Sequence, residues 1–418
     1  MRLTGQSTIE RIPLRVDTGS SYRQPPVARW RRRTAPLALL ACAGALGGCS
    51  IGNDSNQSSP VGAKSGDSNA ASKLGFPASA TRNTIRVGGG DAASDAAGVA
   101  SAVYPATGSK SKPTAVVLVD QANWQDAISA SVLAGPPIGA PILLTGGGDL
   151  PAVTKDTLDR LQPKGSDLSK GAQVIRIGKG TARPDGFKTA VIEGADPYER
   201  AAAIDRFHSA ARGKPSTDVL VVSGEKPEWA MPAAAWGARS GDAVLPVKRD
   251  SVPAPITRAL REHTKPNIYV LGSKDAIGPK ALAALGRLGK VRRIQGPTPV
   301  QNAITFARYQ RGGFGWGVVA PGYNFTVAST DRPGDSAAAA SLATRGVFAP
   351  LLLTDRADAL PQPLEAYLLS VQPGFEGDPS QAVYNRVWVL GDDKTISVKA
   401  QGRLDEITEL VPVQANAP

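Results

Sequence analysis

The sequence predicts an α/β fold made of three tandem modules with parallel sheets. One set of landmarks returns three times along the chain, and each copy alternates short apolar runs with longer helical stretches. Aligning Gly89, Gly194 and Gly296 gives periods of 105 and then 102 residues. Because strands that alternate with helices are typical of βαβ units, the strands of each copy are expected to be parallel.

Each copy opens on a short strand followed by a helix, at 85–91, 191–196 and 293–298. The first opening ends in Gly88-Gly89-Gly90-Asp91, which could bind phosphate at a helix N-terminus. It lacks the G-x-G-x-x-G spacing of a dinucleotide site. We therefore interpret it as a tight turn between strand and helix.

Three further strands are expected in each copy, because apolar, β-branched runs are typical of parallel strands buried on both faces. The expected strands lie at 115–119, 141–145 and 174–178, at 219–222, 243–246 and 268–272, and at 317–320, 350–354 and 387–391. Helical stretches between them carry Asp126, Glu228 and Asp335 at matching places, and a helix is clearest at 256–263.

The first 48 residues predict an export signal. A basic cluster at 29–33 precedes an apolar run at 35–45, which is too short to cross a membrane. The run ends in Leu46-Gly47-Gly48-Cys49, which resembles a bacterial lipobox and predicts lipid attachment to Cys49. Residues 50–82 are polar and predict a flexible tether. A short uncleaved anchor is the alternative, and Sec export, twin-arginine export and a downstream start codon all stay open.

Charge and composition exclude several kinds of site. Half of the net charge of +12 lies in residues 1–48, which hold eight Arg against one Asp and one Glu. The remaining excess suits an anionic partner but is too sparse for a nucleic-acid binder. The only cysteines are Cys42 and Cys49, so the body has no disulfide. We predict no cofactor and no metal site, and expect His208 and His263 to lie on solvated helix surfaces.

One repeated polar feature is a candidate binding site. Lys179, Lys274 and Lys394 each follow a glycine that ends the third long strand of a copy. The carboxyl ends of parallel strands form the ligand crevice of open sheets, and a lysine there suits a phosphate-bearing polymer. The preferred alternative is a solvated turn lysine in each copy.

These landmarks resemble the cell wall-binding repeat type 2 family of Gram-positive surface proteins. The similar segments are 194–201 at the opening of a repeat, 126–127 and 141–145 in its middle, and 271–277 and 390–397 at its end. The resemblance covers about 83–405 and implies Rossmann-like modules, usually three, in a pseudo-threefold arrangement. It also implies non-covalent binding to an anionic wall polymer of the teichoic-acid type. The copies have diverged, since Pro197 replaces an arginine and Glu228 an aspartate of the pattern.

The expected organisation is an N-terminal extension with signal peptide (1–48), a lipidated cysteine and linker (49–82), and three repeats (83–188, 189–291 and 292–418). The expected function is that of a non-catalytic scaffold, lipid-anchored on the outer face of the cell membrane, that binds anionic cell-wall polymer. One alternative is a lipid-anchored α/β enzyme acting on envelope glycans or nucleotides. A substrate-capture lipoprotein for transport is disfavoured, because it predicts two lobes rather than three equal units.

Overall fold

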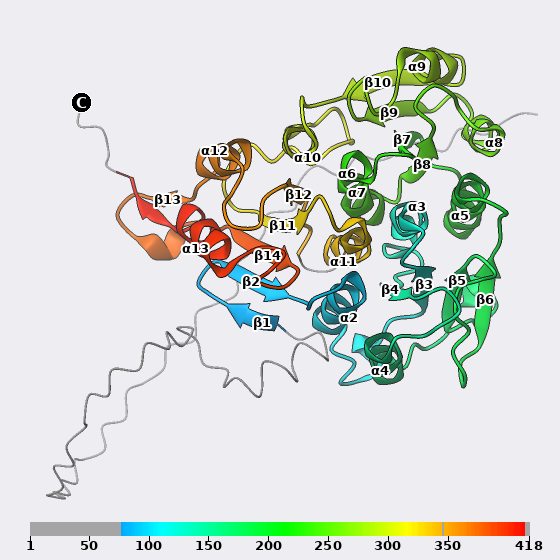
Figure 1. Ribbon diagram of the computed structural model, residues 1–418, viewed down its shortest axis with the longest axis horizontal. Helices are drawn as coiled ribbons and strands as arrows, with labels where there is room; N and C mark the ends of the chain where they lie inside the picture. The colour runs from blue at the N-terminus through cyan, green and yellow to red at the C-terminus, as the bar shows by residue number, and fades with distance from the viewer. Residues whose placement is uncertain (1–76, 345–346, 414–418) are drawn as a thin grey trace, which may run out of the picture. The chain divides into compact units, whose positions relative to one another are not determined.

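The computed structural model describes residues 77–344 and 347–413 (Figure 1). The predicted export signal, Cys49 and most of the predicted tether lie outside these residues. Among the helices of the described part, none is both long and apolar enough to cross a membrane.

The predicted α/β fold with three Rossmann-like modules is confirmed, since three parallel sheets have the same strand order. In each sheet the second long strand of a repeat lies at the edge, next come its first and third long strands, and then a strand that opens a repeat. The first sheet holds β4 (Ile142–Thr145), β3 (Val116–Asp120), β5 (Val174–Ile177) and β6 (Thr189–Ile192). The second holds β8 (Ala243–Val247), β7 (Asp218–Ser223), β9 (Asn267–Leu271) and β10 (Lys290–Ile294). The third holds β12 (Leu351–Thr354), β11 (Asn324–Ser329), β14 (Arg386–Leu390) and β2 (Thr84–Val87), with β1 (Pro77–Ala80) antiparallel at its edge.

The strand that opens each repeat belongs to the sheet of the repeat before it. Strands β6 and β10 complete the first and second sheets, although they open the second and third repeats. Strand β2 opens the first repeat and pairs in parallel with β14, with Thr84 opposite Val387 and Val87 opposite Leu390. The first and third repeats therefore share one sheet, where blue β2 lies beside red β14 (Figure 1).

Helices α2 (Ala92–Val103), α5 (Pro197–Arg212) and α10 (Pro299–Arg308) follow these opening strands. Each is capped by its own residue: Asp91, Asp196 and Thr298 accept the backbone N–H three residues on, as strong N-caps do. Gly88 has a φ of +103°, and a Cβ there would lie 1.5 Å from an oxygen of Asp95. The tight-turn interpretation of 88–91 is confirmed, and the carboxylate of Asp91 occupies the place where phosphate would bind.

Three equivalent helical segments pack on one another between the sheets, which gives the predicted pseudo-threefold arrangement. They are α3 (Trp124–Ser129) with η2 (Ala130–Leu133), α7 (Pro232–Ser240) after α6 (Pro227–Ala230), and α11 (Ser336–Leu342) after η4 (Pro333–Asp335). They are rich in fully buried alanine, which lets the backbones approach closely. A Cβ on Gly135 would lie 2.1 Å from the carbonyl of Ala238, so this contact requires glycine.

The remaining helices lie between later strands of each unit or follow the last one. They are η1 (Ser109–Ser111), α4 (Ala152–Leu161), η3 (Asp167–Ser169), α8 (Ala254–Glu262), α9 (Pro279–Gly286), α12 (Gln362–Ser370), η5 (Pro379–Gln381) and α13 (Val398–Ile407). A short pair of β13 (Gly374–Phe375) and β15 (Val411–Pro412) lies outside the three sheets.

Two sequence predictions are wrong. The expected strand at 317–320 is a loop segment, in which Val319 is 62% exposed, and the strand is β11, which begins at Asn324. Both histidines are buried rather than solvated. His263 lies between two acceptors, with Nε2 2.8 Å from Asp205 and Nδ1 2.7 Å from the carbonyl of Ser216. Helical position alone did not reveal that these histidines face the core.

Buried His208 makes stability depend on pH. Burial lowers its pKa from 6.5 to about 4, so the folded state binds the proton less readily than the unfolded state. Its contribution to stability is therefore lost as pH falls from about 6.5 towards 4. Between pH 7 and pH 5 we expect the wild type to lose about 2 kcal/mol more than His208→Gln, by urea unfolding. Equal losses in the two proteins would show that His208 is readily protonated in the fold.

Candidate functional site

The three predicted site lysines lie in exposed turns at the carboxyl ends of three different sheets. Lys179 follows β5, Lys274 follows β9 and Lys394 follows β14. The amine of Lys179 lies 3.0 Å from a carboxylate oxygen of Glu193, and both side chains are at least half exposed. The structure thus puts each lysine where the sequence predicted, at the end of a strand, but on a sheet of its own.

A guanidinium braces each of these lysine turns. Arg86 donates to the carbonyls of Gly391, Asp392 and Ile396 at 2.6–2.8 Å, and its Nε donates to Gln401 at 2.9 Å. In the second sheet, Arg293 donates to the carbonyls of Gly272 and Ile277, and in the first, Arg176 donates to those of Lys179, Thr181 and Ala182. These hydrogen bonds hold the backbone of each turn in place, while the lysine side chains are exposed.

Buried charged groups also fill two of the three junctions between units at this end of the sheets. Arg200 Nε lies 2.7 Å from Asp126 Oδ2, with both side chains almost buried. Burial raises the pKa of Asp126 to about 6, although Arg200 opposes the shift. At the third junction the equivalent residue is neutral Asn302, whose Oδ1 accepts from the N–H of Gly296.

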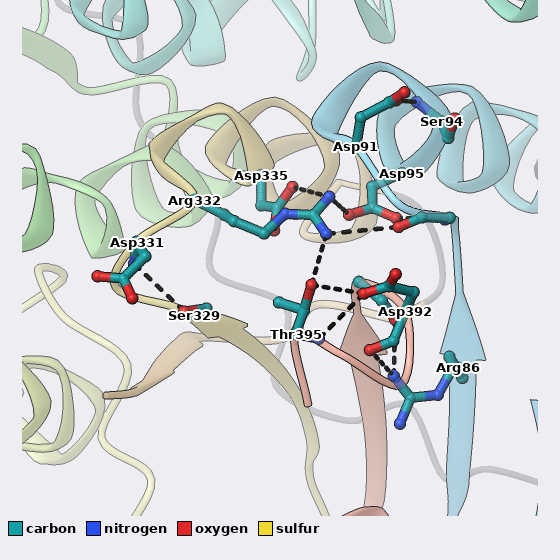
Figure 2. Close-up of polar contacts among 12 residues, drawn as sticks. Arg86, Asp91, Ser94, Asp95, Ser329, Asp331, Arg332, Asp335, Asp392 and Thr395 are labelled. Carbon is teal, nitrogen blue, oxygen red and sulfur yellow. Dashed lines mark hydrogen bonds and ion pairs between the residues drawn. The ribbon is translucent and has the colours of Figure 1, made fainter. Parts of the chain in front are cut away.

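Figure 2 shows the second charged junction, between the first and third units. Here Arg332 from the turn after β11 lies between Asp95 of α2 and Asp335 of η4. Both carboxylates are fully buried, and Arg332 also donates to Thr395 Oγ1 at 2.9 Å. Burial and the neighbouring Asp335 carboxylate raise the pKa of Asp95 well above its usual range, against the opposing charge of Arg332. These residues hold units together, and Arg332 is paired with both acids within the protein.

Hollows open instead at the amino ends of the first strands. A hollow of about 420 Å³ is lined by Lys110, Lys112 and Lys164, and a second of about 420 Å³ by Arg212 and Arg239. Both are also lined by Pro136 and Pro137, so the two hollows are neighbours. We name this surface the basic groove, defined by its five cations: Lys110, Lys112, Lys164, Arg212 and Arg239.

The basic groove is built from segments of all three units. Thr114 precedes β3, Gly241 precedes β8, and Thr344 follows α11, so the groove spans two junctions between units. The lysine turns follow strands, whereas Thr114 and Gly241 of the groove come just before strands. Lys110 lies in η1, Arg212 ends α5 and Arg239 lies in α7, whereas Lys112 and Lys164 lie in loops.

The cations of the basic groove have no ion-pair partner among the described residues. Within the described residues, no carboxylate lines either hollow, and none lies within ion-pair distance of the five cations. Arg212 donates to the carbonyl of Gly241 at 2.7 Å, which aims the guanidinium along the groove wall. The guanidinium of Arg239 lies 4.6 Å from the ring centre of Phe348. Uncompensated cations in a hollow attract anionic ligands.

A third hollow of about 710 Å³ adjoins the groove through Arg239 and Ser240, at the junction of the second and third units. We name it the aromatic pocket, after its lining of Trp236, Trp316, Tyr323 and Phe348, with Asp218 and Asp242 among its polar residues. Each junction between units thus has a hollow at this end of the sheets.

Sequence reasoning missed both surfaces. Their residues differ between the three copies, so alignment of the repeats gives no signal for them. The one usable signal was the aromatic and glycine-rich run at 309–323, which replaces the much shorter connection at 213–217 in the second unit. Such an insertion in one copy is typical of a functional loop.

Comparison with solved structures gives the same fold in two cell wall proteins of Clostridium difficile. Cwp6 matches with a TM-score of 0.61 and 18% identity over 80% of this chain and 49% of its own. Cwp8 matches with a TM-score of 0.59 and 18% identity over 78% of this chain and 52% of its own. The chain thus spans about half the length of either protein. Neither a family model nor a curated protein matches the sequence.

Proposed function

We propose that this protein is a non-catalytic, lipid-anchored surface protein that binds an anionic cell-wall polymer. The basic groove carries the proposal, because two neighbouring hollows present five cations that lack an ion-pair partner among the described residues. The fold shared with two cell wall proteins and the wall-binding family resemblance support a wall ligand. The ligand class is a linear polymer with repeated negative charges, since the five cations are spread over two neighbouring hollows rather than gathered in one.

The predicted anchor at Cys49 complements weak binding by the groove. A diacylglyceryl cysteine would keep the protein at the outer face of the membrane, where wall polymer is concentrated. Each contact with a polymer charge then needs little affinity of its own, since later contacts form at a high effective concentration. Anchoring and polymer binding together describe an envelope scaffold.

The lysine turns at 179, 274 and 394 are a second proposed contact with the polymer. They are less favourable than the groove, because each stands on a separate sheet and Lys179 already has Glu193 as a partner. They offer a matched comparison, since both sets contain three lysines on the same protein.

Polymer binding predicts that Lys110, Lys112 and Lys164, all changed to alanine, lower retention of the purified protein on purified walls by about 100-fold. The estimate rests on about 1 kcal/mol for each lysine that faces a dense anionic surface. Retention is measured by co-sedimentation between 50 mM and 500 mM NaCl, and wild-type retention should fall as salt rises. Walls stripped of their anionic polymers should retain neither protein.

The control is the variant with Lys179, Lys274 and Lys394 changed to alanine, which loses the same formal charge. It should keep most of the wild-type retention if the groove is the main contact. Equal losses in the two variants would mean that total charge, rather than the groove, sets binding. Full retention of the wild type on stripped walls would exclude an anionic polymer as the ligand.

A further inference from the structure

The aromatic pocket contrasts in chemistry with the groove beside it. Aromatic residues make up only 5% of the chain, yet four line this hollow and more pack behind it. The ring of Trp236 lies 4.9 Å from that of Phe314 and 5.5 Å from that of Trp316, and Tyr269 stacks on Phe314 at 3.5 Å. The loop 309–323 therefore supplies a pocket wall whose rings are held in place from behind.

Polar groups are set among these rings. The carboxylate of Asp242 accepts from Trp236 Nε1 at 3.0 Å, which fixes the acid relative to the indole. Asp218 accepts from Asn267 Nδ2 at 2.8 Å, and Asn324 donates to the carbonyl of Val347 at 2.9 Å. Since a carboxylate has about four acceptor positions and an amide oxygen two, all three side chains keep capacity for ligand hydroxyl groups.

The charge and the size of the aromatic pocket limit the kinds of ligand that it can bind. Two carboxylates in the lining disfavour a phosphate or a carboxylate ligand, in contrast to the basic groove. Burial raises the pKa of Asp242 to about 6, against the opposing hydrogen bonds of Ser240 and Trp236. The volume of about 710 Å³ lies in the range of small-ligand sites, and flat apolar rings with a few fixed acceptors suit a ligand with C–H faces and hydroxyl edges.

We propose that the aromatic pocket binds uncharged sugar rings of a wall glycan. The apolar face of a pyranose would stack on Tyr323 or Trp316, and its hydroxyl groups would donate to Asp242 and Asp218. The pocket shares Arg239 with the groove, so a chain with alternating phosphate and sugar could occupy both surfaces at once. This last step rests on the proposed function, whereas sugar binding by the pocket does not.

The test uses the full chain and the phosphate-free oligosaccharides that hydrofluoric acid releases from purified walls of the bacterium that makes the protein. Wild-type protein should bind them in isothermal titration, with affinity unchanged between 50 mM and 500 mM NaCl. Tyr323→Ala and Asp242→Asn should each weaken binding about tenfold or more. Asp242→Asn keeps the shape of the side chain and an acceptor for Trp236, so folding should be preserved.

Two controls separate this proposal from groove binding. Tyr384→Ala removes a more exposed tyrosine that does not line the pocket, and should leave affinity unchanged. The variant with Lys110, Lys112 and Lys164 changed to alanine should lose wall retention but still bind the phosphate-free oligosaccharides. No binding by folded wild type, or wild-type affinity in both pocket variants, would overturn the sugar site while leaving polymer binding by the groove intact.

Discussion

Replacing Arg332 with methionine is expected to lower the free energy of unfolding by about 3–5 kcal/mol. The substitution leaves Asp95 and Asp335 side by side with no cation, and both carboxylates have no solvent exposure (Figure 2). Their folded-state pKa values then rise further above the unfolded values, so the folded state binds more protons. Stability is retained below the unfolded pKa and is lost as pH rises through the folded one, so the deficit should be larger at pH 8 than at pH 5.

Denaturant unfolding at the two pH values measures this effect. Arg356→Met is the control, because that arginine is exposed and only 4.0 Å from an exposed Asp355, and its loss should cost less than about 0.5 kcal/mol. Adding Asp95→Asn and Asp335→Asn to Arg332→Met should recover much of the stability. A deficit that is the same at both pH values would show that the two acids are not buried as charges.

A second large loss is expected for Arg86→Met, also about 3–5 kcal/mol. Arg86 is 4% exposed, and its removal leaves three carbonyls and the side-chain oxygen of Gln401 without their charged donor. The turn at 391–396 should loosen first, because the guanidinium is its brace. Urea unfolding measures the global loss, and amide hydrogen exchange at 391–396 measures the local one.

Arg386→Met is the matched control on the neighbouring strand. Its side chain is exposed, so the change should stay within about 0.5 kcal/mol. If Arg86→Met lowered stability without faster exchange at 391–396, its role would be packing of the sheet rather than bracing of the turn.

Much of the fold could be predicted from the sequence, because strands buried on both faces leave continuous apolar runs. The segments at 115–119 and 350–354 are of this kind, and helix caps such as Asp196 are local signals. The prediction failed at 317–320, where an apolar run belongs to an exposed loop. The true strand β11 contains Asn324 and buried Thr326, so its pattern is less apolar than that of its counterparts.

The candidate site could be predicted only in part. Lysine turns follow directly from strand ends, and the structure has them there. The basic groove depends on which segments the packing of the three units brings together, and Lys112 and Arg239 are 127 positions apart with no repeat relating them. The pairing of β2 with β14 likewise depends on contacts across the whole described chain, for which local sequence has no signature.

That pairing has a consequence for how the protein survives damage. Because the opening strand of every repeat lies in its neighbour's sheet, a protease that cuts one connection between units separates no free module. Each piece stays held by a full strand ladder and by a shared apolar core. A molecule nicked at one such connection is therefore expected to keep its three units together.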